Sequence, residues 1–324
     1  MSKKKQIILL CVLFLFSIYC AISIGQSWDE GFHLLQGKIT LDYLFSFGRI
    51  DKDLFYREYY SPIYWSIQYL LTNIFPSQYK IESTHFINLL FSLGTIFGLG
   101  KFSKELFNKK VSKIVFLVLF FYPIFFGHMG FNSKDTILAF CHVWLFYLVL
   151  KYLKNQSNKN LLIIGFLAAM GTGIQLFFLG SLLPIIIFLF YEIFFFKKII
   201  SSKFNKKKFF YDIFKCFLVF YIFLVLFWVD VHSNIFILPF QIALKTLSAD
   251  FFTGYPYNLI NGDYFISSEV PKYYLFTNLI YKSPEYFLLT YIIFFILFFI
   301  KKVFFINEFK FFNYKLFLLI LILL

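Results

Sequence analysis

Long apolar runs alternate with short polar segments along most of this chain. A helix that crosses a membrane needs about 20 consecutive, mainly apolar residues. The pattern predicts about nine such helices, near residues 6–26, 84–100, 113–128, 136–152, 161–179, 182–196, 209–230, 285–300 and 311–324. The last run reaches the final residue without a polar flank, so we expect either a fragment or a chain that lacks a C-terminal part. The fold class that follows is an all-α polytopic membrane protein, a single domain over residues 1–324.

Segment 61–75, SPIYWSIQYLLTNIF, is too short to cross a membrane. Fifteen helical residues reach about 22 Å, whereas the hydrocarbon core is roughly 30 Å thick. Its apolar side chains recur on one helical face, and these are Ile63, Ile67, Leu70, Leu71 and Ile74. A short helix with one apolar face is typical of a helix that lies in the membrane interface.

The positions of the basic residues indicate which loops lie on the cytoplasmic side of the membrane, provided that segment 61–75 does not cross it. Segments 1–5, 101–113, 151–160, 197–208 and 301–310 then share one side, and they hold 20 of the 31 basic residues. Cytoplasmic loops are enriched in Lys and Arg. We therefore expect a protein of the bacterial cytoplasmic membrane with a cytoplasmic N-terminus and with outer loops at 27–83, 129–135 and 231–284.

Composition agrees with this class. The chain is 60% hydrophobic and 15% charged, which is typical of a polytopic membrane protein. The net charge of +14 comes from lysine clusters between apolar runs, so we predict contact with membrane lipids and not with nucleic acid. The four cysteines lie inside apolar runs without metal-ligand spacing, and we predict no metal site and no resident cofactor, although two adjacent carboxylates could hold a divalent ion.

The stretch WDEGFH, residues 28–33, follows the first span directly. Asp29 and Glu30 there lie where the dielectric is lower than in water, which makes a carboxylate more basic and suits it to act as a general base. The alternative is an interfacial belt with ordinary solvated charges. His33 lies one turn further along.

The second polar group is GHMGFNSKDTILAF, residues 127–140, a short connection between two spans. It contains His128, Asn132, Lys134 and Asp135. Capping of the next helix by Asn132 or Ser133 explains the acid, but it does not explain an outward lysine. Lys134 could hold a phosphate or pair with Asp29.

The last outer loop contributes tyrosines that could stack on a sugar ring and lysines that could bind an anionic head group, Tyr273 and Lys272 among them. Taken one by one, these residues fit simple surface positions equally well.

These motifs together resemble the dolichyl-phosphate-mannose–protein mannosyltransferases and the bacterial aminoarabinose transferases of the GT-C superfamily. WDEGFH is similar to the acidic pair after the first span in those enzymes. HMGFNSKDTILAF resembles their H-x-x-x-N-P-K-D hairpin, with Ser133 in place of proline, and VPKYYLFTNLIYKSPEYFLL resembles a later block, with Lys272 in place of tryptophan.

The resemblance implies a GT-C-type bundle and an inverting glycosyltransferase. Such an enzyme moves a sugar from a polyprenyl-phosphate donor to an acceptor outside the membrane. The resemblance also implies that Asp29 is the base, that Glu30 is its supporting neighbour and that Asp135 is a further acid of the site. The expected substrate-binding residues are His33, Arg57, His128, Asn132, Lys134, Lys272 and Tyr273. A transporter of lipid-linked sugars and a non-catalytic scaffold are the alternatives.

Overall fold

The computed structural model describes residues 3–51, 59–247 and 256–300. Contacts divide the chain into two units, one made of residues 1–121 and 125–244 and the other of residues 122–124 and 245–324. The single-domain organisation stays a prediction.

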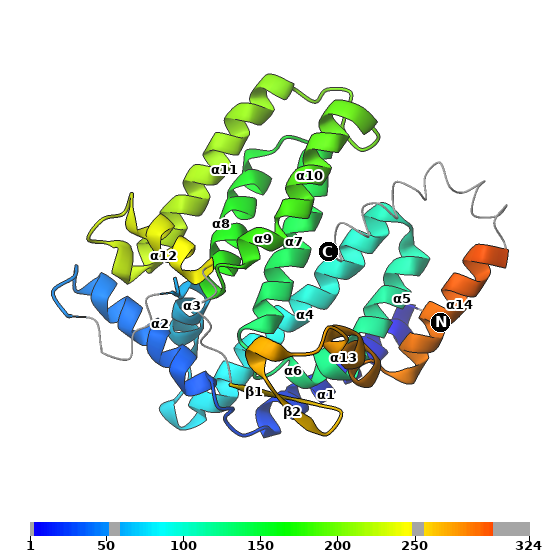
Figure 1. Ribbon diagram of the computed structural model, residues 1–324, viewed down its shortest axis with the longest axis horizontal. Coiled ribbons are helices and arrows are strands. Elements are labelled where there is room, and N and C mark those ends of the chain that lie inside the picture. The colour runs from blue at the N-terminus through cyan, green and yellow to red at the C-terminus, as the bar shows by residue number, and fades with distance from the viewer. Residues whose placement is uncertain (1–2, 52–58, 248–255, 301–324) are drawn as a thin grey trace. The chain divides into compact units, whose positions relative to one another are not determined.

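Four helices form the centre of the larger unit (Figure 1). They are α4 (Lys80–Leu106), α7 (Asp135–Lys154), α8 (Asn158–Ile174) and α11 (Lys206–Phe227). Each packs against the next in that order, and α1 (Lys3–Ser23) and α5 (Lys109–Phe120) both pack on α4. Small residues allow the close approach between these apolar helices, as at Gly165, where an added Cβ would lie 2.8 Å from the Cys216 carbonyl oxygen.

Two shorter helices lie across one end of this bundle, α2 (Glu30–Phe45) and α3 (Ile63–Thr72). α3 contacts α2, α4, α8 and α11. Backbone meets backbone here because glycine leaves room for it. A Cβ on Gly37 would lie 2.3 Å from the Trp65 carbonyl oxygen, and one on Gly173 would lie 2.2 Å from that of Ser61.

α3 buries a face of mixed character, which includes Ile63, Tyr64 and Trp65 of its first turn. Ser66, Gln68 and Thr72 are buried, whereas Leu70 and Leu71 are exposed. An apolar outer face is expected where lipid replaces water as the solvent. Ten helical residues reach only about 15 Å, so α3 cannot span a membrane. Its interfacial position stays a prediction.

The other helices that the structure describes before residue 248 are short. They are η1 (Ser77–Tyr79), α6 (Pro123–His128), α9 (Phe178–Ser181), α10 (Leu183–Tyr191), the π-helical turn η2 (Glu192–Phe196), η3 (Val229–Val231) and α12 (Leu238–Leu247).

Within the described ranges, the number of helices long and apolar enough to span is four, or up to five if a bent pair is one span. Two shorter apolar helices cover residues 7–23 and 158–174. The predicted count of about nine is therefore not confirmed. The expected span at 113–128 is divided into α5 and α6 because Pro123, which cannot donate a backbone hydrogen bond, begins a new helix. The expected span at 311–324 lies outside the described residues.

The second unit contains the one departure from an all-helical fold that the structure describes. Strands β1 (Tyr257–Ile260) and β2 (Asp263–Ile266) pair antiparallel, with Tyr257 opposite Ile266. Asn261 and Gly262 both have positive φ, 53° and 94°, as a two-residue hairpin turn requires. The class is thus mostly helical. The short η5 (Ser267–Glu269) follows, and α13 (Tyr274–Lys282) and α14 (Glu285–Ile300) then meet at a sharp bend of 112°.

Three of the basic segments meet at one end of the larger unit. Glu105, in the last turn of α4, contacts both Lys151 and Lys154 of α7, at 2.7 and 2.5 Å. The Asn205 N–H before α11 donates to the Gln156 side chain after α7, at 2.8 Å. These contacts bring segments 101–113, 151–160 and 197–208 to one end of the unit, as expected if they share one side of a membrane. Which compartment this basic end faces stays a prediction.

Candidate functional site

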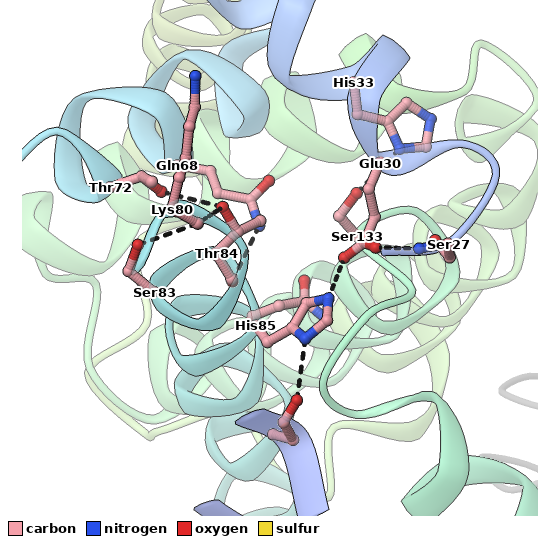
Figure 2. Close-up of polar contacts among 12 residues, drawn as sticks. Ser27, Glu30, His33, Gln68, Thr72, Lys80, Ser83, Thr84, His85 and Ser133 are labelled. Atoms are coloured by element: carbon pink, nitrogen blue, oxygen red, sulfur yellow. Dashed lines mark hydrogen bonds and ion pairs between the residues drawn. The ribbon is translucent and has the colours of Figure 1, made fainter. Parts of the chain in front are cut away.

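Glu30, the first residue of α2, is buried and makes two polar contacts (Figure 2). One carboxylate oxygen accepts a hydrogen bond from the Ser27 N–H at 2.5 Å, and the other lies 2.6 Å from Nε2 of His85. The opposite ring nitrogen of His85, Nδ1, lies 2.9 Å from the carbonyl oxygen of Ala21. This chain of contacts joins the end of α1, the turn before α2 and the first turns of α4.

The proton on His85 follows from its partners. A carbonyl oxygen can only accept, so Nδ1 carries a hydrogen and donates it to Ala21. At Nε2, a single further proton lies between the imidazole and the Glu30 carboxylate. His85 is fully buried and Glu30 is 4% exposed, so neither side chain relies on water for its hydrogen bonding. A buried charged group of this kind is stable only when it is paired.

Asp29 precedes this anchored residue and has the opposite environment. It occupies the N-cap position of α2, its side chain makes no capping hydrogen bond, and it is exposed. The backbone of Asp29 is fixed by two contacts. Its carbonyl oxygen accepts the His33 N–H at 3.0 Å, and the next residue, Glu30, contacts His85. The structure thus presents one exposed carboxylate beside one buried carboxylate.

His33 connects α2 to the hairpin before α7. Its Nδ1 lies 3.0 Å from the Ser133 hydroxyl, and its ring stacks on Trp65 with centroids 4.1 Å apart. The Trp65 indole N–H donates to the carbonyl oxygen of Ser133 at 3.3 Å. Burial first, and then the nearby charge of Lys134, lower the pKa of His33 to about 3, so its ring is neutral at physiological pH.

The hairpin is shaped by Asn132. Its side-chain oxygen accepts the N–H groups of Lys134 and Asp135, at 3.2 and 2.9 Å. Its amide nitrogen donates to the Asp135 carboxylate at 3.0 Å and to Nδ1 of His128 at 3.1 Å. The N-cap position of α7 is occupied by Lys134, and not by Asn132 or Ser133 as expected, but the Asn132 side chain still binds the first N–H groups of the helix. Asp135 is exposed, as Asp29 is.

Polar side chains of α4 support the hairpin from inside the bundle. Asn88 donates to the Met129 carbonyl oxygen at 3.0 Å and to the Thr136 hydroxyl at 3.2 Å, and it accepts the Tyr64 hydroxyl at 2.9 Å. Ser92 donates to the same carbonyl oxygen at 3.0 Å.

Sequence reasoning missed His85, Asn88 and Ser92. A signal for them existed, because they recur at a spacing of three and four residues along an apolar helix, which places them on one face. Polar side chains within a membrane helix usually face the bundle interior and mark functional sites.

The predicted residues are therefore brought together in part. The start of α2, with Asp29, Glu30 and His33, meets the hairpin of His128, Asn132, Lys134 and Asp135 through the contact of His33 with Ser133. In the described part of the chain no ion pair links Lys134 to Asp29, and the charge of Lys134 acts on His33.

The other three predicted residues do not add to this cluster. Arg57 lies outside the described residues. Lys272 and Tyr273 belong to the second unit, where they precede α13. Among the residues that the structure describes, no group of three or more His, Cys, Asp or Glu side chains could hold a metal ion.

Apolar helices that surround polar residues converging at one end define the class: a polytopic membrane protein with a candidate site at one end of its helical bundle. A family model described as dolichyl-phosphate-mannose-protein mannosyltransferase matches residues 61–228, more than half of the chain. The chain belongs to this family and is thus a membrane glycosyltransferase, and the family implies a lipid-linked sugar donor. No curated protein and no solved structure matched the chain.

The matched range includes His85, Asn88 and the hairpin, and it begins after WDEGFH. Family membership therefore rests on the region that supports Glu30 and His33, and not on the acidic pair itself.

Proposed function

We propose that this protein transfers a sugar from a polyprenyl-phosphate donor to an acceptor at the outer face of the cytoplasmic membrane, with inversion at the anomeric carbon. The family match carries the proposal, because the enzymes it describes take their sugar from dolichyl phosphate. The convergence of the α2 start with the hairpin supports a site at the end of the bundle away from the basic segments.

Asp29 is the general base in this proposal. The acceptor hydroxyl or amine attacks the anomeric carbon and gives its proton to Asp29, while the bond from that carbon to the phosphate oxygen breaks. The polyprenyl phosphate leaves with the bonding electron pair. General-base assistance of this kind contributes about 10²–10⁴-fold.

Lys134 stabilises the charge that grows on the leaving phosphate. It is half-buried in the hairpin, and its field already reaches His33. A fixed cation at a developing negative charge lowers the barrier because it need not reorganise during the reaction. Neutral His33 adds no second positive charge beside it.

Glu30 positions Asp29 and takes no proton from the acceptor. Both of its oxygens already have partners, the Ser27 N–H and His85, and it is buried. Asp135 lies at the hairpin and is exposed, so it can contact the acceptor or the sugar.

The test supplies the purified protein in lipid vesicles with radiolabelled polyprenyl-phosphate mannose and a membrane extract as the source of acceptor. Wild-type protein should release polyprenyl phosphate and move the label to an acceptor. Asp29→Asn should abolish transfer with the protein still folded. Asp42→Asn, at another exposed carboxylate of α2, is the matched control and should leave transfer unchanged.

Full activity of Asp29→Asn would refute the assignment of the base. Failure of the wild type with mannosyl, glucosyl and aminoarabinosyl donors would refute the donor class. Movement of intact lipid-linked sugar across the vesicle membrane, without cleavage of the sugar–phosphate bond, would support a transporter.

A further inference from the structure

A cavity of about 500 Å³ lies between α1, α4 and α5. Its walls are mainly apolar, with Leu10 and Leu13 from α1, Phe97 from α4, and Phe116 and Leu117 from α5. Its size is within the range of small-molecule sites, about 300–1,000 Å³. The cavity is far along the helices from the candidate site, because Leu10 precedes Ala21, the partner of His85, by about three helical turns.

Three lysines share the lining of this cavity with the apolar residues. Lys101 and Lys104 come from the last turns of α4, and Lys113 comes from the first turns of α5. Segment 101–113 carries five lysines and one glutamate, Glu105. Both oxygens of that glutamate contact lysines of α7. The acid nearest to the cavity in sequence therefore pairs with α7.

Two side-chain contacts also fix the walls of the cavity. The Ser112 hydroxyl of α5 donates to the Gly100 carbonyl oxygen of α4 at 2.7 Å, which fixes the two helices against each other where the lysines lie. Lys101 extends over the ring of Trp144, with its Nζ 5.2 Å from the ring centroid. These contacts make a preformed recess with an apolar interior and a basic rim.

We propose that this recess binds one anionic phospholipid from the membrane leaflet at the basic end. An acyl chain fills the apolar interior along Leu13 and Phe97, and the phosphate lies at the rim beside Lys104 and Lys113. Basic pockets between transmembrane helices are typical binding sites for anionic lipid head groups, and each lysine near the surface contributes about a five-fold gain in affinity. The bound lipid would join α1 to α4 and α5, and it takes no part in sugar transfer.

The experiment measures lipid binding to the full chain in detergent by native mass spectrometry, with dioleoyl phosphatidylglycerol as the probe and dioleoyl phosphatidylcholine as the neutral comparison. Wild-type protein should retain one phosphatidylglycerol in preference to phosphatidylcholine. The double variant Lys104→Gln/Lys113→Gln should lose affinity for phosphatidylglycerol by about 25-fold, five-fold for each lysine. The matched control, Lys159→Gln/Lys207→Gln, removes two lysines from the same end but outside the cavity, and it should change affinity less than three-fold.

Three results would overturn the proposal. The first is equal retention of the two lipids by the wild-type protein. The second is an equal loss of affinity in the control pair, which would show a general attraction to the basic end. The third is protection of the wild type against heat by glycerol 1-phosphate as effectively as by the lipid, which would show an anion site without an acyl chain. The first and third results need no variant, so misfolding of a variant leaves the proposal testable.

Discussion

Replacement of His85 by leucine should destabilise this protein strongly, whereas replacement of Glu30 by glutamine should not. His85→Leu leaves the Glu30 carboxylate buried with one remaining partner, the Ser27 N–H. Glu30→Gln keeps both contacts, because the amide oxygen can accept the Ser27 N–H and the amide nitrogen can donate to a neutral His85. Both variants remove the charge pair, but His85→Leu leaves a buried carboxylate, whereas Glu30→Gln leaves a buried neutral amide.

The expected sizes follow from the burial of the pair. Removal of one partner of a buried charge pair costs about 3–5 kcal/mol, because the other charge is left uncompensated. Exchange of a hydrogen bond to a charged group for a neutral one between the same partners costs about 0.5–1.5 kcal/mol. The double variant Glu30→Leu/His85→Leu removes both polar groups together, and it should be more stable than His85→Leu alone.

Thermal unfolding in detergent, followed by tryptophan fluorescence, measures these differences. A change of 1 kcal/mol moves the melting temperature of a 150–250-residue domain by about 2–4 °C. His85→Leu should therefore melt about 6–20 °C below the wild type, and Glu30→Gln should melt within about 6 °C of it. Asp42→Asn, an exposed change on α2, is the control and should melt within about 2 °C of the wild type.

Two outcomes would show that this reasoning is wrong. A melting temperature of His85→Leu within 2 °C of the wild type would mean that the pair carries no buried charge. A double variant less stable than His85→Leu would mean that Glu30 is stabilised by contacts other than His85.

Two further predictions concern α2. The unfolded chain protonates His33 near its ordinary pKa of 6.5, whereas the folded protein resists protonation until about pH 3, so stability is lost as the pH falls below 6.5. Between pH 7.5 and 5.5 the wild type should lose about 1.4 kcal/mol more than His33→Gln, and equal pH dependence of their melting temperatures would contradict this. Gly37→Ala places a Cβ 2.3 Å from the Trp65 carbonyl oxygen and should cost about 1–3 kcal/mol. Gly180→Ala, with open space around the added Cβ, is its control, and equal melting temperatures of the two variants would refute the steric argument.

Part of the candidate site could be predicted from local sequence. The acidic pair at Asp29 and Glu30 and the hairpin around Asn132 are visible as polar residues that interrupt apolar runs. The role of Asn132 at the start of α7 depends on neighbours two and three residues away, so the sequence contains all that is needed to propose it.

The different environments of the two carboxylates could not be predicted in this way. Glu30 is buried because His85, 55 positions later, supplies its partner, and Asp29 is exposed because nothing in the described chain folds over it. The same holds for His33, whose contact with Ser133 joins residues 100 positions apart. Adjacent residues with the same chemistry thus acquire different roles from distant contacts.

The sequence by itself determined the class of protein, the helical character of most of the chain and the gathering of basic residues between apolar runs. Each of these depends on composition and on short-range periodicity, because these decide which segments are stable in lipid and which in water. Only the tertiary structure decided that α3 buries Ser66, Gln68 and Thr72, that the span expected at 113–128 is broken, and that His85 and Asn88 hold the start of α2 and the hairpin. These features depend on which helices pack together, because a polar side chain in an apolar bundle lies wherever another part of the chain offers it a hydrogen-bond partner.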